Sequence, residues 1–288
     1  MTAGSGGSGP PRGELRIEGL SVALERPAPS GQPWPAPQAQ GRTAGLLPVL
    51  EDVSLLVPAG RTAALVGASG AGKSMTAYAV LRLFPAPARI TAGRILLDGA
   101  DLTAMSEREL TAVRGRRVAM IFQEPGAALD PLMTAGAQVM EGIVAHLGRR
   151  GARDRAVEAL NRVGLDASFF RRYPHELSGG QRQRVLIAGA IAPGPDLLIA
   201  DEPTAALDVT VQAQILDLLG RLQRDLGMAL LLITHDLGVV AQTADLVHVM
   251  RGGRIVESAE THALFASPQH PYTQAIVTQA RRLGRWAE

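Results

Sequence analysis

The 288-residue chain contains no cysteine, and this absence excludes disulfide bonds, thiolate metal sites and cysteine nucleophiles. Aromatic residues make up only 3% of the chain, which favours an Ala/Leu/Val-rich α/β protein over a β-sandwich. No apolar run reaches the roughly 18 residues that a membrane-spanning helix needs. The Gly/Ser/Pro-rich N-terminus also lacks the apolar segment of a signal peptide. We therefore expect a cytoplasmic protein that reaches a membrane only through a partner.

Lysine is almost absent as well, because 28 of the 29 basic residues are arginine and one is lysine. The formal net charge is only +2, so the surface as a whole is not strongly cationic. Arginines cluster at residues 114–117, 149–155 and 281–285, without interleaved aromatic side chains. Such clusters are typical of solvated helix faces or loops, and we expect no nucleic-acid partner.

Short apolar segments along the chain predict strands. They lie at residues 15–24, 53–57, 62–66, 94–102, 118–122, 197–200 and 230–234. The last two are continuously apolar, as in parallel strands that are covered on both faces. Apolar residues at helical spacing predict a helix over 211–226 between these two strands. Ser106 and Glu109 predict a capping box at the start of another, shorter helix.

The single lysine, Lys73, stands in a segment that fits the phosphate-loop (Walker A) pattern G-x-x-x-x-G-K-[ST]. A predicted strand at 62–66 precedes this loop and a predicted helix over 74–83 follows it, which is the context that the motif requires. Backbone N–H groups and a helix N-terminus in such a loop bind a polyphosphate. Lys73 would bridge the β- and γ-phosphates, and the Ser74 hydroxyl would ligate Mg²⁺. The loop consists of Gly67, Ala68, Ser69, Gly70, Ala71, Gly72, Lys73 and Ser74, and alone it predicts binding of ATP or GTP.

Two adjacent carboxylates, Asp201 and Glu202, end the predicted strand at 197–200. This is the edge at which open α/β sheets bind ligands. An Asp-Glu pair can also cap a helix, but two acids directly after a buried strand are costly unless a cation compensates them. We expect Asp201 to hold Mg²⁺ and Glu202 to accept the proton of, or to orient, an attacking water.

A third motif, LSGGQ, lies shortly before this acidic pair, at residues 177–181. Ser178 and Gln181 can form a capping box at an ordinary helix start. Together with the two preceding motifs, however, the segment resembles the signature of the ATP-binding subunits of ABC transporters. The resemblance implies that the signature of one subunit faces the γ-phosphate of ATP held by the other subunit. The signature residues are Leu177, Ser178, Gly179, Gly180 and Gln181.

The resemblance also assigns roles to single residues. Gln123 matches the glutamine that touches the Mg²⁺ and water site and couples to the membrane subunits. Asp208, in the segment 206–208, matches the loop that crosses the dimer interface, and His235 matches the histidine that contacts the γ-phosphate. The resemblance thus implies catalytic roles for Glu202, His235 and Gln123. Six motifs occur in the family's order over residues 14–275, which makes the resemblance specific.

The fold implied by the resemblance is α/β: a P-loop NTPase core with a mostly parallel sheet flanked by helices, an antiparallel β subdomain and an inserted helical subdomain. We divide the chain into a disordered tail at 1–13, an ATPase domain at 14–262 and a C-terminal tail at 263–288. Within the domain, residues 26–48 form a Pro-rich insertion, and residues from about 126 to 190 form the helical subdomain.

Four segments resemble the peptide/nickel importer branch of the family. They lie at residues 89–96, 122–134, 173–178 and 267–273. The branch implies ATP and Mg²⁺ as cofactors and a second ATP-binding subunit, the same or different. It also implies two transmembrane permease subunits, an extracytoplasmic substrate-binding protein and a peripheral position on the cytoplasmic face of the inner membrane. The lack of cysteine excludes the iron–sulfur cluster of many peptide-transport relatives and shifts the expectation mildly from peptides towards nickel.

The aromatic residue on which the family usually stacks adenine is missing. Leu24 occupies its expected place, and Trp34 of the Pro-rich insertion is a possible substitute, so the adenine platform stays unassigned. Two other functions also stay open. One is a soluble ABC ATPase of DNA repair or translation, and the other is a weakly hydrolysing interaction subunit of a heterodimer.

Overall fold

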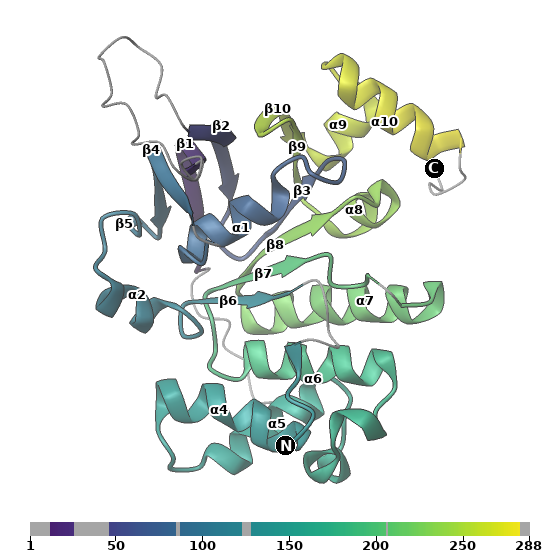
Figure 1. Ribbon diagram of the computed structural model, residues 1–288. Coiled ribbons are helices and arrows are strands. Elements are labelled where there is room, and N and C mark those ends of the chain that lie inside the picture. Colours follow the sequence, from purple (N-terminus) through teal and green to yellow (C-terminus); the bar gives the residue numbers. More distant parts are fainter. Residues whose placement is uncertain (1–11, 26–45, 85–86, 123–127, 206, 283–288) are drawn as a thin grey trace, which may run out of the picture.

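The computed structural model describes residues 12–25, 46–84, 87–122, 128–205 and 207–282. These residues form an α/β fold in which a mixed sheet lies between an antiparallel sheet and a helical layer (Figure 1). The predicted fold class is therefore confirmed. No helix in the described part of the chain is both long and apolar enough to cross a bilayer.

The antiparallel sheet has the strand order β2-β1-β4-β5. Its strands are β1 (Leu15–Glu25), β2 (Leu46–Val57), β4 (Ala88–Leu97) and β5 (Ala100–Asp101). The insertion predicted at 26–48 gives its last three residues to β2, and residues 26–45 lie outside the described part of the chain. Pro48 is tolerated in β2 because this strand is at the edge of the sheet, where a missing N–H costs no ladder bond.

The mixed sheet has the order β10-β9-β3-β8-β7-β6. Its strands are β3 (Thr62–Val66), β6 (Val118–Ile121), β7 (Leu197–Asp201), β8 (Ala229–Thr234), β9 (Leu246–Arg251) and β10 (Arg254–Glu260). All neighbouring pairs are parallel except β9 and β10. The carboxyl ends of β3, β7 and β8 therefore meet at one edge, where the three predicted active-site segments begin.

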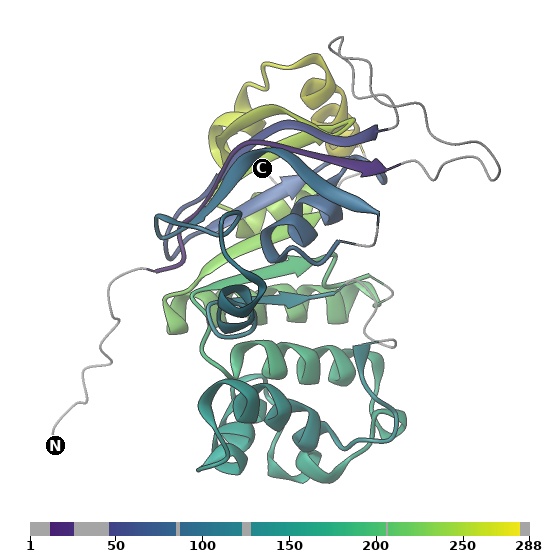
Figure 2. The ribbon, with the colours of Figure 1, turned by 60° about the vertical axis from the view of Figure 1, so that its left-hand side comes forward.

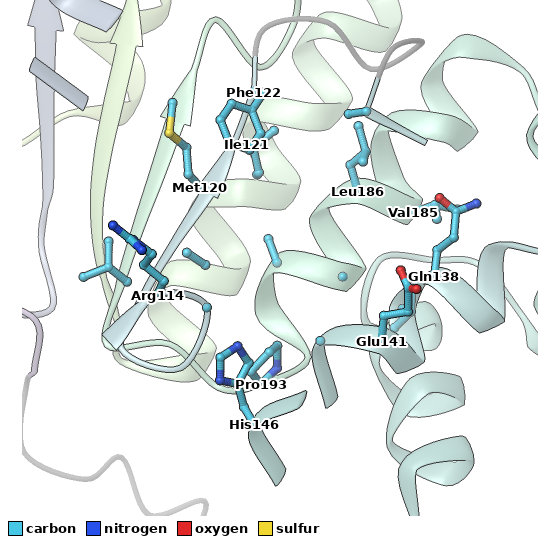
Figure 3. Close-up of a pocket in the computed structure, with 18 of the residues that line it drawn as sticks. Arg114, Met120, Ile121, Phe122, Gln138, Glu141, His146, Val185, Leu186 and Pro193 are labelled. Carbon is cyan, nitrogen blue, oxygen red and sulfur yellow. The ribbon is translucent and has the colours of Figure 1, made fainter. Parts of the chain in front are cut away.

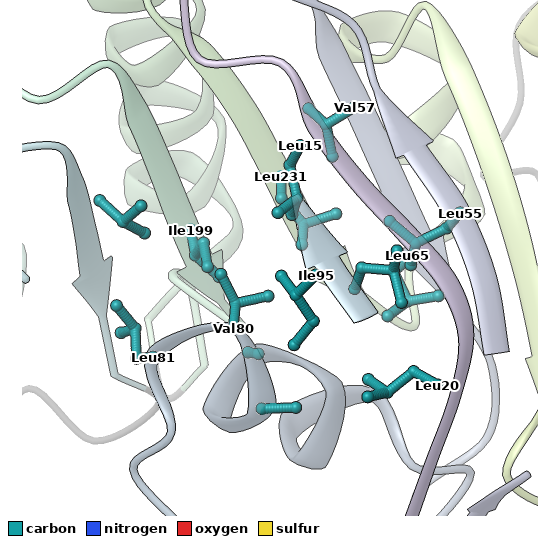
Figure 4. Close-up of a cluster of buried hydrophobic side chains, with 14 of the residues drawn as sticks. Leu15, Leu20, Leu55, Val57, Leu65, Val80, Leu81, Ile95, Ile199 and Leu231 are labelled. Atoms are coloured by element: carbon teal, nitrogen blue, oxygen red, sulfur yellow. The ribbon is translucent and has the colours of Figure 1, made fainter. Parts of the chain in front are cut away.

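Two hydrophobic cores cover the two faces of the mixed sheet, because successive side chains of each strand point to opposite faces. In β8, Leu231 and Ile233 pack towards the antiparallel sheet, whereas Leu230 and Leu232 pack towards the helical layer. Figure 4 shows the first core, in which Leu65, Ile199 and Leu231 meet Leu15 and Ile95 of the antiparallel sheet. The continuous apolar runs of the sequence are thus strands buried on both faces.

Helix α1 (Lys73–Leu81) lies in the first core, and helix α7 (Val209–Leu226) covers the opposite face of the sheet (Figure 1). Below α7 lies a helical group, seen again in Figure 2. It consists of α4 (Ala135–Leu147), α5 (Ala152–Arg162), η1 (Ala167–Arg171), η2 (Pro174–Glu176) and α6 (Gly179–Ile191). Helix α2 (Glu107–Val113) starts at Ser106, and the predicted capping box with Glu109 is confirmed.

The chain is folded beyond residue 262. Helices α8 (Leu237–Thr243), α9 (Thr261–Ala266) and α10 (Pro271–Arg282) form a third core with β3 and β9. In α10, the buried residues Thr273, Val277 and Ala280 recur every three or four positions and so share one helix face. Most of the segment predicted as a C-terminal tail is therefore a packed part of the domain, and residues 283–288 lie outside the described part.

Candidate functional site

The phosphate loop joins β3 to α1, and its surroundings and backbone conformation require glycine at the two glycine positions of the motif. A Cβ atom on Gly67 would lie 2.3 Å from the Met250 carbonyl oxygen at the end of β9. Gly72 has φ 110°, in the left-handed region, and a Cβ atom there would lie 2.8 Å from the Leu50 side chain. The loop is therefore fixed against the sheet, and its glycines allow the close approach that a phosphate-binding backbone needs.

The ammonium group of Lys73 binds to the backbone of its own loop. The side chain is only 8% exposed, and Nζ donates hydrogen bonds to the carbonyl oxygens of Gly67 at 2.9 Å and Ala68 at 3.1 Å. Since these carbonyls carry only partial charges, a phosphate anion would be a stronger partner for the ammonium group. The loop thus presents a buried positive charge that a polyphosphate can neutralise.

Asp201 supplies an unpaired carboxylate beside the loop. It ends β7, is 1% exposed, and neither carboxylate oxygen has a hydrogen-bond partner of standard geometry among the described residues. Burial raises the pKa of Asp201, and Glu202 adds to this effect, whereas the Ser74 hydroxyl and Lys73 favour the charged form. A buried carboxylate without partners next to a hydroxyl suits a hard cation such as Mg²⁺.

Asp201 and Ser74 suit a cation that is also bound by the phosphates of a nucleotide. The described part of the chain contains no group of three His, Asp or Glu side chains that would hold a metal by itself. Mg²⁺ typically takes one or two protein ligands and completes its shell with phosphates and water. Asp201 and Ser74 can therefore supply the protein share of such a shell.

Glu202 and His235 are in direct contact. The Nδ1 atom of His235, directly after β8, lies 3.0 Å from each carboxylate oxygen of Glu202. The Glu202 side chain is 13% exposed, whereas that of His235 is 67% exposed. Glu202 also has φ 46°, a left-handed conformation that costs a non-glycine residue energy. The structure thus places the predicted base and the predicted histidine together, with the base shielded and the imidazole open to solvent.

The predicted signature forms a separate group. Ser178 caps the N-terminus of α6 and forms a capping box with Gln181, and Asp208 caps α7 by accepting a hydrogen bond from Val211 N–H at 2.9 Å. The two helix starts touch, because a Cβ atom on Gly180 would lie 2.7 Å from the Val211 side chain. Among the described residues, no hydrogen bond or ion pair joins the signature or Asp208 to the phosphate loop.

Three residues named in the sequence predictions, Gln123, Ala206 and Trp34, lie outside the described residues. Leu24 lies in β1, opposite Leu47 and Ala88. One contact of the loop was not predicted, since the Tyr272 hydroxyl accepts a hydrogen bond from Ala68 N–H at 3.2 Å. Tyr272 belongs to the segment 267–273 that resembles the importer branch, but nothing local in that segment indicates a contact with the loop.

A cavity of about 400 Å³ lies between β6 and the helical group, and Phe122 and Ala128 are among the residues that line it. Figure 3 shows Ile121 and Phe122 of the sheet side facing Leu186 and Gln138 of the helices across this space. Phe122, which lines this cavity, is exposed. This arrangement offers an apolar groove to a partner segment.

Comparisons with known proteins agree on one family. Residues 50–205 match the family model described as ABC transporter. A putative peptide import ATP-binding protein of Brucella melitensis is 49% identical over 245 residues, which are 82% of this chain and 72% of that protein. The dipeptide transport ATP-binding protein DppD of Escherichia coli is 48% identical over 232 residues, 79% of this chain and 71% of that protein.

Solved structures show the same fold. CbiO1 from Clostridium perfringens, part of the transporter complex CbiONQ, has a TM-score of 0.72 at 25% identity and covers 94% of this chain and 96% of its own. A dimeric post-hydrolysis state of the ATP-binding cassette MJ0796, bound to ADP and Pi, has a TM-score of 0.69 at 26% identity. The match covers 86% of this chain and 98% of the cassette.

Proposed function

The chain belongs to the ABC transporter family as one of its ATP-binding, ATP-hydrolysing subunits, and from this premise we propose that it drives the import of di- or oligopeptides. Two relatives that share about half of their aligned residues with it are named for peptide import or dipeptide transport. These names favour peptides over nickel, the alternative that the sequence left open. They also give no support to a role in DNA repair or translation.

The proposed ATP site combines the phosphate loop with Asp201. Loop N–H groups and the N-terminus of α1 bind the phosphates, and Lys73 turns from the carbonyls of Gly67 and Ala68 to the β- and γ-phosphates. Mg²⁺, when bound, neutralises charge that develops on the phosphates during transfer. Ser74 and Asp201 would hold it. The single observation that carries this proposal is the buried Asp201 carboxylate, whose two oxygens have no hydrogen-bond partner of standard geometry in the described part of the chain.

In the proposed reaction, Glu202 takes the proton from the water that attacks the γ-phosphate. Its carboxylate lies directly after Asp201 and in contact with His235, so both side chains start within reach of one reacting centre. When Nδ1 of His235 carries the proton, it donates to the Glu202 carboxylate and fixes its orientation. His235 is then the group that contacts the γ-phosphate, and Gln123 is the group that orients the water.

We further propose that two subunits enclose two ATP molecules. The signature at 177–181 and Asp208 belong to the start of α6 and α7 and make no polar contact with the phosphate loop of the same chain among the described residues. A partner subunit can use them, because a capped helix N-terminus directs N–H groups and a positive dipole end towards an anion. The dimeric form of the MJ0796 cassette supports this arrangement.

The groove between β6 and the helical group is the proposed contact with a membrane subunit. Most of its lining is apolar, with Arg114, Glu141 and His146 among the polar residues, and it can take an amphipathic helix of a permease. A nucleotide-dependent change at the ATP site would then pass to the permease as a shift between two states. A substrate-binding protein outside the membrane would deliver the peptide.

The test is uptake of labelled dipeptide and of labelled nickel in cells that carry the wild-type chain or Glu202→Gln. Glu202→Gln keeps the shape of the side chain but removes the base, so ATP should still bind while hydrolysis falls by roughly 10²–10⁴-fold. Dipeptide uptake should fall with it, and nickel uptake should not. Glu18→Gln, in an exposed pair with Arg94, is the matched control and should leave uptake unchanged.

Each outcome has a clear meaning. Loss of nickel uptake alone would replace the proposed substrate, and unchanged uptake of both would reject the importer assignment. Near-normal ATP hydrolysis by Glu202→Gln would reject the role of Glu202 as the base.

A further inference from the structure

The C-terminal helix α10 contacts the phosphate loop across the third core. Tyr272, the second residue of α10, accepts a hydrogen bond from the N–H of Ala68, the second residue of the loop. The two residues are 204 positions apart in the chain. Among the described residues, this is the only hydrogen bond between α10 and the loop.

Several contacts hold Tyr272 in place. The Glu257 carboxylate on β10 accepts hydrogen bonds from the N–H groups of Gln269 and His270, each at 2.8 Å, and so anchors the start of α10 to the sheet. His270 Nδ1 then accepts the Tyr272 N–H at 3.1 Å. On the other side, the guanidinium of Arg251 lies 5.0 Å from the centre of the Tyr272 ring, in cation–π contact. The hydroxyl is therefore positioned from two sides.

The segment of the loop that Tyr272 touches has few other fixed contacts. The Gly67 and Ala68 carbonyls accept hydrogen bonds from Lys73. These bonds must break when Lys73 turns to the phosphates. A cavity of about 290 Å³, lined by Gly67, Ala68, His235 and α10, leaves this side of the segment without close packing. Three contacts then remain: the close approach of Gly67 to Met250, the hydrogen bond from Ala71 N–H to the Ala68 carbonyl oxygen at 3.1 Å, and the Tyr272 hydrogen bond. The Tyr272 hydroxyl is the contact that binds the Ala68 N–H.

We infer that Tyr272 is a positioning residue for nucleotide binding, because its hydroxyl holds the Gly67–Ala68 segment in the conformation that receives the phosphates after Lys73 has left it. The Ala68 N–H points to Tyr272, so the residue acts through the loop backbone and not on the nucleotide. This inference rests on the proposed role of the loop as the ATP site. On this inference, α10 and the β9–β10 hairpin support the ATP site, although both lie C-terminal to all of its sequence motifs.

The test compares Tyr272→Phe with Thr278→Val in the purified full-length chain. Tyr272→Phe removes only the hydroxyl and keeps the ring under Arg251. Thr278→Val removes a hydroxyl from an exposed position of the same helix. Loss of one neutral hydrogen bond should raise the Kd for Mg²⁺·ATP by about three- to tenfold. Thr278→Val should leave it unchanged. Hydrolysis at saturating ATP should stay within about twofold of wild type in both, because uniform binding, not the chemical step, is altered.

A double-mutant cycle tests the path through Arg251. Arg251→Gln alone should raise the Kd, by less than Tyr272→Phe does. Arg251 acts by positioning the Tyr272 hydroxyl. In a chain that already carries Tyr272→Phe, Arg251→Gln should therefore cause no further rise in the Kd. Full additivity would mean that Arg251 acts separately and would overturn this part of the inference.

Lys73→Ala separates this inference from the proposed site. If Lys73→Ala still binds ATP with wild-type Kd, the loop is not the ATP site and the proposed function fails. If Lys73→Ala loses binding but Tyr272→Phe binds as wild type, only the role of Tyr272 is overturned. A lower melting midpoint of Tyr272→Phe with an unchanged Kd also overturns it, because the hydroxyl would then only stabilise the fold.

Discussion

Replacing Asp201 by Asn should stabilise the nucleotide-free protein and remove its response to Mg²⁺. The wild-type carboxylate is buried, and neither oxygen has a hydrogen-bond partner of standard geometry among the described residues. Burial raises the pKa of this carboxyl, so the fold disfavours its charged form. Asparagine has nearly the same shape without the charge. The free energy lost by burying an unpaired charge is therefore recovered in the variant.

The size of the gain follows from the unsatisfied group. An unpaired buried polar group costs roughly 1–3 kcal/mol, and the nearby Ser74 hydroxyl and Lys73 offset part of it. Since about 1 kcal/mol moves the melting midpoint of a large domain by roughly 2–4 °C, the midpoint should rise by about 2–6 °C at pH 7.5. The raised pKa means that the folded state binds the proton more tightly than the unfolded state. The wild-type penalty therefore exists above the folded-state pKa of Asp201 and vanishes below about pH 3.9. The difference in melting midpoint between Asp201→Asn and wild type should therefore shrink as the pH falls towards 4.

Thermal unfolding of the full-length chain measures both effects. Wild type should gain stability from ATP in EDTA and gain more when Mg²⁺ is added, whereas Asp201→Asn should show only the first increment. Asp196→Asn is the matched control, since the Asp196 carboxylate is paired with Arg117 at 2.9 Å and Arg12 at 3.4 Å. The melting midpoint of Asp196→Asn should be lower than that of wild type at pH 7.5. An Asp201→Asn chain that is no more stable than wild type, or that still responds to Mg²⁺, would refute the reasoning.

Three further changes test other parts of the structure. Burial lowers the pKa of His248, so denaturant titrations should show stability falling as the pH drops below about 6.5, and His248→Gln should flatten this dependence. Gly93→Ala should cost more than about 2 kcal/mol because its Cβ would lie 2.4 Å from the Gly19 carbonyl oxygen, whereas Gly99→Ala, with similar φ and open space, should cost only about 1–2 kcal/mol. Ser178→Arg should block ATP hydrolysis while ATP still binds to the single chain; wild-type turnover would contradict the shared site.

The central sheet was predictable wherever strands are buried on both faces. The apolar runs at 62–66, 118–122, 197–200 and 230–234 became β3, β6, β7 and β8 almost residue for residue. The strands β9 and β10 were missed. His248 interrupts the apolar run of β9, and β10 is an edge strand with four charged or polar residues among its seven. An edge strand has one covered side and little need for apolar side chains, so it leaves a weak signal.

The site shows the same division between local and distant information. The loop glycines, Lys73 and the acidic pair after β7 could be identified because each motif is contiguous and its chemistry depends on its own residue types. The packing of α10 could not be identified, because its buried face carries Thr273, Val277 and Ala280, which form only a weak apolar pattern. The contact of Tyr272 with Ala68 joins segments 204 positions apart and needs the tertiary structure.

The single lysine makes the loop chemically distinct from the rest of the chain. Lys73 offers the one side-chain amine of the sequence, and it is 8% exposed and held by two carbonyl oxygens. An amine-acylating reagent, or a protease that cleaves after lysine, therefore has a single internal target, while the 28 guanidinium groups do not react. The rate at which the reagent or protease attacks Lys73 therefore reports how often this loop opens, and no label has to be introduced into the chain. A ligand that occupies the loop should slow that attack.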